Sequence, residues 1–211
     1  MVAISSEKTG NLRRMSKNEL KKLQQQLISA SDSNLLASTV RLADEYLALS
    51  PGSVRALIDK AHALAGLSRY EESLSVYQDA IDALQDGQSP DAIYGEIGNL
   101  HRAKGEFSEA VVYYRKQIES DPDDATGYLF LGTLQLQQGE INAAQETLES
   151  ANKCTGGCID ELKVALGNTM RAKGDYQQAA ACYTEALQVS PGNALAKAAL
   201  KDVRQAMVGS Q

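Results

Sequence analysis

The chain has 211 residues, of which 43% are hydrophobic, and a net charge of −6. No segment approaches the ~18 consecutive apolar residues that a membrane-spanning helix needs. Residues 1–22 hold six basic and two acidic residues (net +4), whereas the remainder holds 15 basic and 25 acidic residues (net −10). An acidic body disfavours nucleic acid as the main partner. We therefore expect neither nucleic acid nor a membrane to be bound, and we expect a cytoplasmic location because residues 1–15 lack the apolar run of a secretory signal.

The N-terminal part of the chain predicts a tail followed by one degenerate helix hairpin. Residues 1–15 are predicted to form a flexible basic tail, and residues 16–208 a single repeat array. Apolar residues at helical spacing predict a helix over 18–30, and a second amphipathic helix is expected over 35–49. Between them, Ser31-Asp32-Ser33 is expected to be a turn or a helix N-cap. The range 20–53 therefore forms an atypical first repeat, as terminal units of repeat proteins commonly do.

Four stretches then repeat one pattern of small, aromatic and glycine positions. They cover residues 54–87, 91–124, 125–158 and 160–193, and the step is 34 residues from Gly98 to Gly132 and 35 from Gly132 to Gly167. A fixed period of this size is the signature of stacked helix hairpins and points to a binding scaffold. After them, residues 194–207 predict one capping helix with Leu195, Ala198, Ala199 and Val203 on its apolar face.

Helix packing explains which residue types recur within each copy. Small residues at positions 8 and 20 let two helix axes approach to about 8–10 Å. They are Ala61, Gly98, Gly132 and Gly167 at position 8, and Ser73, Ala110, Ala144 and Ala179 at position 20. Larger residues at positions 17 and 24 are expected to fill the core around that contact, with the hydroxyls of Tyr77, Tyr114 and Tyr183 near an edge. Position 15 is Ser68, Gly105, Gly139 or Gly174, where we expect a left-handed helix end.

The period and these offsets resemble the tetratricopeptide repeat, a helix-turn-helix unit of 34 residues. The resemblance implies an all-α fold, a right-handed superhelical α-solenoid whose first (A) helices line a concave groove. In that family the groove positions are 2, 5, 9, 12 and 13. Carried over to this chain, they give the candidate peptide-binding residues Arg55, Ile58, His62, Asn99, Arg102, Leu129, Thr133, Leu136, Asn168 and Arg171.

The candidate groove residues combine polar and apolar side chains in a way that suits an extended peptide. Asparagine can bond both a backbone N–H and a C=O, and arginine can hold a carboxylate in a bidentate manner. The aliphatic residues Ile58, Leu129 and Leu136 would offer apolar contact between the polar ends. The alternative interpretation, ordinary exposed helix residues, is equally compatible with the pattern.

One specialised use of such a groove can be tested by residue. Some family members grip the acidic C-terminal tail of chaperones with a clamp of lysine, asparagine and arginine at set positions. Here Asn99 fits, but Gly95 replaces the clamp lysine, Phe130 replaces the second asparagine, and Glu161 and Ala165 replace the basic pair. We therefore predict that the chain does not bind chaperone tails.

No catalytic, cofactor-binding or metal-binding motif stands out in the sequence. Cys154, Cys158 and Cys182 are too few for a disulfide framework and have no histidine near them, so reduced thiols and no metal are expected. Asp121, Asp123 and Asp124 lack calcium-loop spacing and are expected to form a turn and a helix N-cap.

The sequence therefore predicts a non-catalytic protein–protein interaction scaffold that binds a peptide or helix of a partner protein. Two alternatives stay open. The chain could be a regulatory or chaperone-like module of a larger enzyme or of a secretion or assembly complex. It could also self-associate into a homo-oligomer through its atypical first hairpin, which carries Leu20, Leu23, Leu27 and Leu36.

Overall fold

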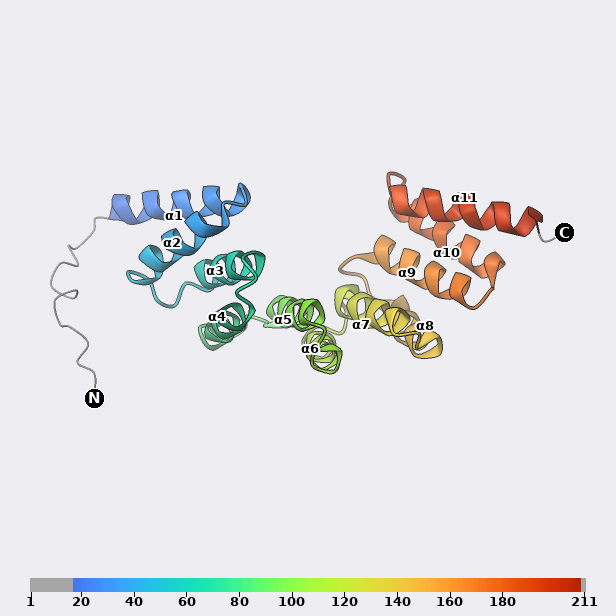
Figure 1. Ribbon diagram of the computed structural model, residues 1–211, viewed down its shortest axis with the longest axis horizontal. Coiled ribbons are helices and arrows are strands. Elements are labelled where there is room, and N and C mark those ends of the chain that lie inside the picture. The colour runs from blue at the N-terminus through green and yellow to red at the C-terminus, as the bar shows by residue number, and fades with distance from the viewer. Residues whose placement is uncertain (1–16, 210–211) are drawn as a thin grey trace. The chain divides into compact units, whose positions relative to one another are not determined.

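The computed structural model describes residues 17–209, and within that range eleven α-helices and one short 3₁₀ helix account for the regular structure (Figure 1). The predicted tail, residues 1–15, lies outside the described part of the chain. An isolated parallel bridge between Asp124 and Gly156 is the β-type pairing recorded among the described residues. The fold class is therefore an all-α helical-repeat solenoid, as the sequence predicts.

The helices divide into two compact units, one ending at Asp86 and the other beginning at Gly87. The first unit contains α1 (Lys17–Asp32), α2 (Leu36–Leu47), α3 (Val54–Gly66) and α4 (Tyr70–Asp82). The second contains α5 (Asp91–Lys104), α6 (Phe107–Ser120), α7 (Ala125–Gln137), α8 (Ile141–Ser150), the 3₁₀ helix Ala151–Lys153, α9 (Ile159–Ala172), α10 (Tyr176–Val189) and α11 (Ala194–Gly209). Each of the five expected repeat ranges holds one helix pair. That the repeats form a single array stays a prediction.

Within the second unit, each hairpin is closed by a glycine of the A helix against a large residue of the B helix. A Cβ atom added to Gly98 or Gly167 would lie 2.5 Å from Cε1 of Tyr114 or Tyr183, and one added to Gly132 would lie 2.5 Å from Cγ of Leu148. Real Cβ atoms essentially never come so close, so even alanine would force the facing side chain or its helix to move. The small residue of position 8 is thus required by the large residue of position 24.

The first hairpin reverses this pair of sizes. Its counterpart of position 8 is Leu27 and its counterpart of position 24 is Ala43, and both are buried in one cluster with Leu23, Leu42 and Tyr46. A large residue on the A helix therefore accompanies a small one on the B helix, so the volume at the contact is kept although the residues are exchanged. Close packing responds to the sum of the volumes at a contact, which is how a degenerate repeat still forms a hairpin.

Each A helix of the four later repeats ends with a residue in the left-handed region. The φ angles are 80° at Gly105, 80° at Gly139 and 82° at Gly174, as position 15 predicts, and Ser68 adopts 60° without the freedom of glycine. The first hairpin follows the same rule with Asn34, at φ 53°. Asparagine tolerates this conformation better than most residues. Asn34 therefore takes the place of the glycine that follows the A helix in the later repeats.

One local expectation was only partly right. Ser33 lies in the turn after α1, as expected, but Ser31-Asp32-Ser33 is not an N-cap, because α1 continues through Asp32 and α2 begins at Leu36 after Leu35, whose side chain makes no capping bond. Instead, the Ser31 hydroxyl donates a hydrogen bond to Asp59 Oδ1 at 3.2 Å, which ties α1 to α3.

The face of the last helix also differs from the expected one. Leu195 is 72% exposed and Ala198 is exposed, whereas Val203 is buried and Ala199 half-buried, as expected, together with the buried Ala196 and Leu200. The buried residues follow a spacing of three and four from Ala196, so the first half of the apolar face of α11 contains Ala196 and Leu200 in place of Leu195 and Ala198.

The loop before α9 pairs with the loop before α7. Gly156 O accepts a hydrogen bond from Ala125 N at 3.1 Å, and Asp123 O accepts one from Thr155 N at 3.2 Å. Asp124 caps α7 by accepting from Thr126 N at 2.7 Å, in agreement with the predicted N-cap. The cysteines are free thiols. Burial raises the pKa of the Cys154 thiol, and the neighbouring aspartates raise it further, which keeps it protonated and weakly nucleophilic at neutral pH.

Gln117 occupies a position that is alanine in the other three copies. Its side chain is 7% exposed and fills the space beside two glycines: a Cβ on Gly95 would lie 2.8 Å from Gln117 Oε1, and one on Gly127 would lie 3.3 Å from its Cγ. Oε1 is buried and accepts no hydrogen bond. Gln135, by contrast, accepts a bond from the Thr147 hydroxyl at 2.8 Å through the same atom.

We expect Gln117→Met to raise the free energy of unfolding by about 1 kcal/mol, because it keeps the volume and removes an unsatisfied acceptor. Gln135→Met is the matched control and should lower it by about 1 kcal/mol, because it strands the Thr147 hydroxyl. Thermal unfolding followed by circular dichroism would measure both. Equal loss of stability in the two variants would show that the Gln117 carbonyl is satisfied in solution.

Candidate functional site

The predicted groove residues divide between the two units. Arg55, Ile58 and His62 lie on α3 in the first unit. The other seven lie on the A helices of the second unit, namely Asn99 and Arg102 on α5, Leu129, Thr133 and Leu136 on α7, and Asn168 and Arg171 on α9. Within that unit α7 packs against α9, and α9 packs against α11 (Figure 1). The structure therefore brings the residues of α7 and α9 onto neighbouring helices.

On α3, the predicted polar residues are held by neighbours in their own unit. Arg55 Nε lies 3.1 and 3.0 Å from the two carboxylate oxygens of Asp59, which is only 3% exposed and also accepts the Ser31 hydroxyl. Arg55 thus neutralises a buried charge. His62 is exposed, with its ring edge-on to Tyr77 at 5.8 Å, and Ile58 is half-buried. Removing Arg55 would leave Asp59 unpaired, so its first role is structural.

Two asparagines of the second unit are oriented by buried tyrosines. The Tyr114 hydroxyl donates to Asn99 Oδ1 at 2.9 Å, and the Tyr183 hydroxyl donates to Asn168 Oδ1 at 2.7 Å. Both tyrosines are 0% exposed, while both asparagines are half-buried. Because the tyrosine occupies the oxygen, the other end of each side-chain amide presents its N–H donors. The helix core thereby fixes which way these asparagines face.

An exposed arginine accompanies each of these pairs. Arg102 and Arg171 follow Asn99 and Asn168 by three residues, a spacing that places the side chains next to each other on a helix surface. Burial raises the pKa of the Tyr114 and Tyr183 hydroxyls, and the guanidinium groups of Arg102 and Arg171 act in the opposite direction. The second and fourth full repeats therefore carry the same constellation of tyrosine, asparagine and arginine.

The repeat between them carries apolar residues at the corresponding places. Leu129, Thr133 and Leu136 of α7 are half-buried, and Leu129 packs at the margin of the core that α9, α10 and α11 share. Here position 24 is Leu148, which has no hydroxyl, and position 9 is Thr133 in place of asparagine. Gly95, at groove position 5 of α5, is buried under Gln117 and offers no side chain.

The sequence predicts Tyr114 and Tyr183 as core residues only, without a role in the groove. Their burial is as predicted, but their hydroxyls also position groove asparagines. The signal was present in the sequence, because asparagine at position 9 occurs in the two copies that have tyrosine at position 24 and an arginine at position 12. Among the residues that the structure describes, no cluster of three or more potential metal ligands occurs, and no helix is long and apolar enough to cross a membrane.

Helix hairpins repeated at a period of 34 to 35 residues, each closed by the same interhelical contact, define a helical-repeat protein. Two family models, both described as tetratricopeptide repeat, match residues 101–163 and 161–193. The chain belongs to the tetratricopeptide repeat family.

Known proteins with similar sequence or structure agree with this assignment. Over 111 residues the chain is 32% identical to the Hsp70-Hsp90 organising protein of Plasmodium falciparum, an alignment that covers 52% of this chain and 43% of that protein. The crystal structure of YrrB, a tetratricopeptide repeat protein with an unusual peptide-binding site, superimposes with a TM-score of 0.56 at 18% identity over 83% of this chain and 88% of that one. The first such domain of Spaghetti (RPAP3), bound to the HSP90 peptide SRMEEVD, gives a TM-score of 0.50 at 20% identity over 56% and 93%. The chain spans less than half the length of the curated relatives it matches.

Because burial raises the pKa of Tyr114 and Tyr183, their neutral form is favoured in the folded state. The stability that this provides is fully present below the unfolded pKa of about 10 and is lost as the pH rises through the higher folded pKa. We expect the melting temperature of the wild type to fall more steeply above pH ~10 than that of the double variant Tyr114→Phe/Tyr183→Phe. Thermal melts at a series of pH values would show the two curves converging.

The same double variant gives a direct check of the assignment. Its absorbance titration should lack two tyrosinates that form late in the wild type, since ionisation must expose a buried hydroxyl. Parallel melting curves and an unchanged late phase would mean that the hydroxyls titrate as if they were in water.

Proposed function

We propose that the chain is a non-catalytic interaction scaffold, and that the A helices α5, α7 and α9 bind a peptide or helix of a partner protein. The observation that carries this proposal is the repeated constellation of tyrosine, asparagine and arginine on α5 and α9, with the half-buried leucines of α7 in the intervening repeat. Asparagines whose orientation is fixed by the core lose little entropy on binding, which is how preorganisation raises affinity.

The chemistry of the site also indicates the class of peptide. Arg102 and Arg171 are exposed cations on a chain that is acidic outside residues 1–22, and each can hold a carboxylate in a bidentate manner. Leu129 and Leu136 favour aliphatic or aromatic side chains between such carboxylates. The fitting ligand is therefore a peptide with acidic residues on either side of an apolar segment. The relatives support a peptide ligand in general, because their names or structures include peptide-binding proteins.

Arg102→Glu/Arg171→Glu should weaken peptide binding while the protein stays folded, because both side chains are exposed. The probe is a phage-displayed library of random short peptides selected on the wild type, followed by titration of the enriched peptides. We expect acidic and apolar sequences, with affinity lowered about tenfold or more in the variant, since each arginine–carboxylate contact is worth on the order of 1 kcal/mol.

The matched control reverses two exposed cations outside these helices' groove positions, Arg115→Glu/Lys153→Glu, and should bind as the wild type does. Circular dichroism melts of both variants would establish that the fold is kept. Selected peptides that bind the groove variant as tightly as the wild type would remove the assignment to α5, α7 and α9.

The chaperone peptide SRMEEVD, to which the Spaghetti domain is bound, should bind this chain far more weakly than it binds that domain. The reason is the absence of the clamp: Gly95 replaces a lysine, Phe130 an asparagine, and Glu161 and Ala165 the basic pair. Glu161 would also repel the acidic tail. Isothermal titration with the peptide would measure this, and the Spaghetti domain would serve as the positive control. Binding to this chain as tight as to the Spaghetti domain would show that a different set of residues forms the clamp.

A further inference from the structure

The last helix, α11, keeps the register of an A helix. Residue 194 lies 34 positions after the start of the fourth repeat at 160, and Ala196, Leu200 and Val203 fall on positions 3, 7 and 10. The same positions are buried in the fourth repeat as Leu162, Leu166 and Thr169. The helix therefore packs on α10 as an A helix packs on the B helix of the preceding hairpin.

Positions 4, 8 and 11 of an A helix face the B helix of its own hairpin. At position 4, Lys163 Nζ lies 3.0 Å from Glu185 of α10. At position 8, Gly132 lies against Leu148, and at position 11, Gln135 accepts the Thr147 hydroxyl, both on α8. In α11 these three positions are Lys197, Lys201 and Arg204, and all three are exposed. The surface of α11 that would contact a B helix in the other hairpins therefore carries three cations.

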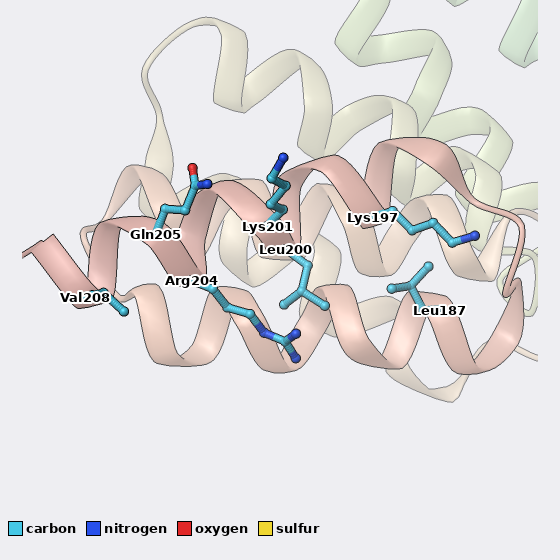
Figure 2. A pocket seen from close by; sticks show the side chains of 7 residues that line it. All are labelled: Leu187, Lys197, Leu200, Lys201, Arg204, Gln205 and Val208. Carbon is cyan, nitrogen blue, oxygen red and sulfur yellow. The ribbon is translucent and has the colours of Figure 1, made fainter.

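A groove with an apolar floor lies along this surface of α11. It encloses a volume of about 620 Å³ between α10 and α11 and is lined by Leu187, Lys197, Leu200, Lys201, Arg204, Gln205 and Val208. Figure 2 shows Leu187 of α10 and Leu200 of α11 side by side between the two helices, with Lys197, Lys201 and Arg204 spaced along α11. Lys201 stands where the four full repeats have glycine or alanine. An ordinary B helix of the array therefore cannot approach as closely as it does in the other hairpins.

We propose that this groove, the α10–α11 groove, docks an acidic amphipathic helix of another protein in the place of a B helix. The apolar floor would take the small and aliphatic residues of that helix, and the three cations would meet carboxylates on its flank. Complementary charge selects this occupant, because the groove gathers three cations on a chain that is acidic outside residues 1–22. This surface is distinct from the groove residues of α5, α7 and α9.

The structure itself supplies the design of a probe. A peptide with the sequence of α10, Tyr176–Val189, is this chain's own example of a B helix. Replacing Cys182→Glu and Tyr183→Glu within the peptide, and keeping Glu185, places carboxylates at positions 23, 24 and 26, which face an A helix in the hairpins. A hydrocarbon crosslink between positions 177 and 181, both exposed in α10, would hold the isolated peptide helical.

Fluorescence anisotropy with the full chain would compare this acidic peptide with two others, one with lysine at the same three positions and one with the acidic sequence scrambled. We expect the acidic helix to bind at least about tenfold more tightly than either, since three ion pairs and a seated apolar face are gained. Lys197→Glu/Lys201→Glu/Arg204→Glu should reverse the preference in favour of the lysine peptide.

Two matched variants separate this groove from general charge effects and from the proposed peptide site. Lys21→Glu/Arg115→Glu/Lys153→Glu changes the net charge equally at exposed positions elsewhere and should bind as the wild type does. If Arg102→Glu/Arg171→Glu lowers binding of the probe and the α11 variant does not, the probe occupies the peptide site of α5, α7 and α9, which would overturn the proposal. Equal binding of the acidic and scrambled peptides, or no reversal in the α11 variant, would overturn the proposal and leave α11 as a solvated capping helix. A doubling of the chain's mass without peptide, lost in the α11 variant, would overturn it in favour of a second copy.

Discussion

The structure of the second unit depends on the contact between a small residue at position 8 of the A helix and a large residue at position 24 of the B helix. Each glycine there meets a ring or a leucine at a distance that leaves no room for a methyl group. The contact sets the separation of the two helices. It also carries the buried ring of Tyr114 or Tyr183 across the hairpin, so that its hydroxyl arrives at the asparagine of the A helix. The contact between positions 8 and 24 therefore positions both the core residues and the polar groups of the candidate groove.

What the repeats preserve is volume and polarity at a contact rather than a residue type. The first hairpin exchanges the two sizes. Leu27 occupies the position that is glycine in the second unit, and Ala43 occupies the position that is tyrosine or leucine there. Gln117 replaces an alanine only because Gly95 and Gly127 vacate the space it needs. Lys60, which replaces an aliphatic residue, pairs with Asp44 at 2.7 Å while its stem stays half-buried. Each departure from the pattern is matched by another residue that is distant in sequence but adjacent in space.

These compensating contacts explain which features of the structure could be predicted from the sequence and which could not. The helices and their left-handed ends follow from local signals, periodicity and glycine placement, and Gly105, Gly139 and Gly174 behave as their positions predict. Partners across the hairpin do not follow from local signals. Arg55 reads as a groove residue until Asp59 is seen beneath it, and Asn99 and Asn168 read as free amides until the tyrosine hydroxyls are placed. On α11, Val203 is buried as predicted, but Leu195 and Ala198 are not, because residues 194–200 are mostly alanine and leucine and only contact with α10 selects Ala196 and Leu200.

Electrostatics ties the two proposed surfaces of the second unit together. Outside residues 1–22 the chain has a net charge of −10, so an acidic partner is repelled at long range and attracted only where cations gather. At moderate ionic strength, salt screens the repulsion between charges more than about 10 Å apart. Ion pairs that form beside apolar side chains are partly buried, so salt weakens them less. An acidic partner is then rejected by most of the surface and retained where cations stand beside leucines. The combination of charge and apolar area, rather than charge alone, is what would make the proposed sites specific.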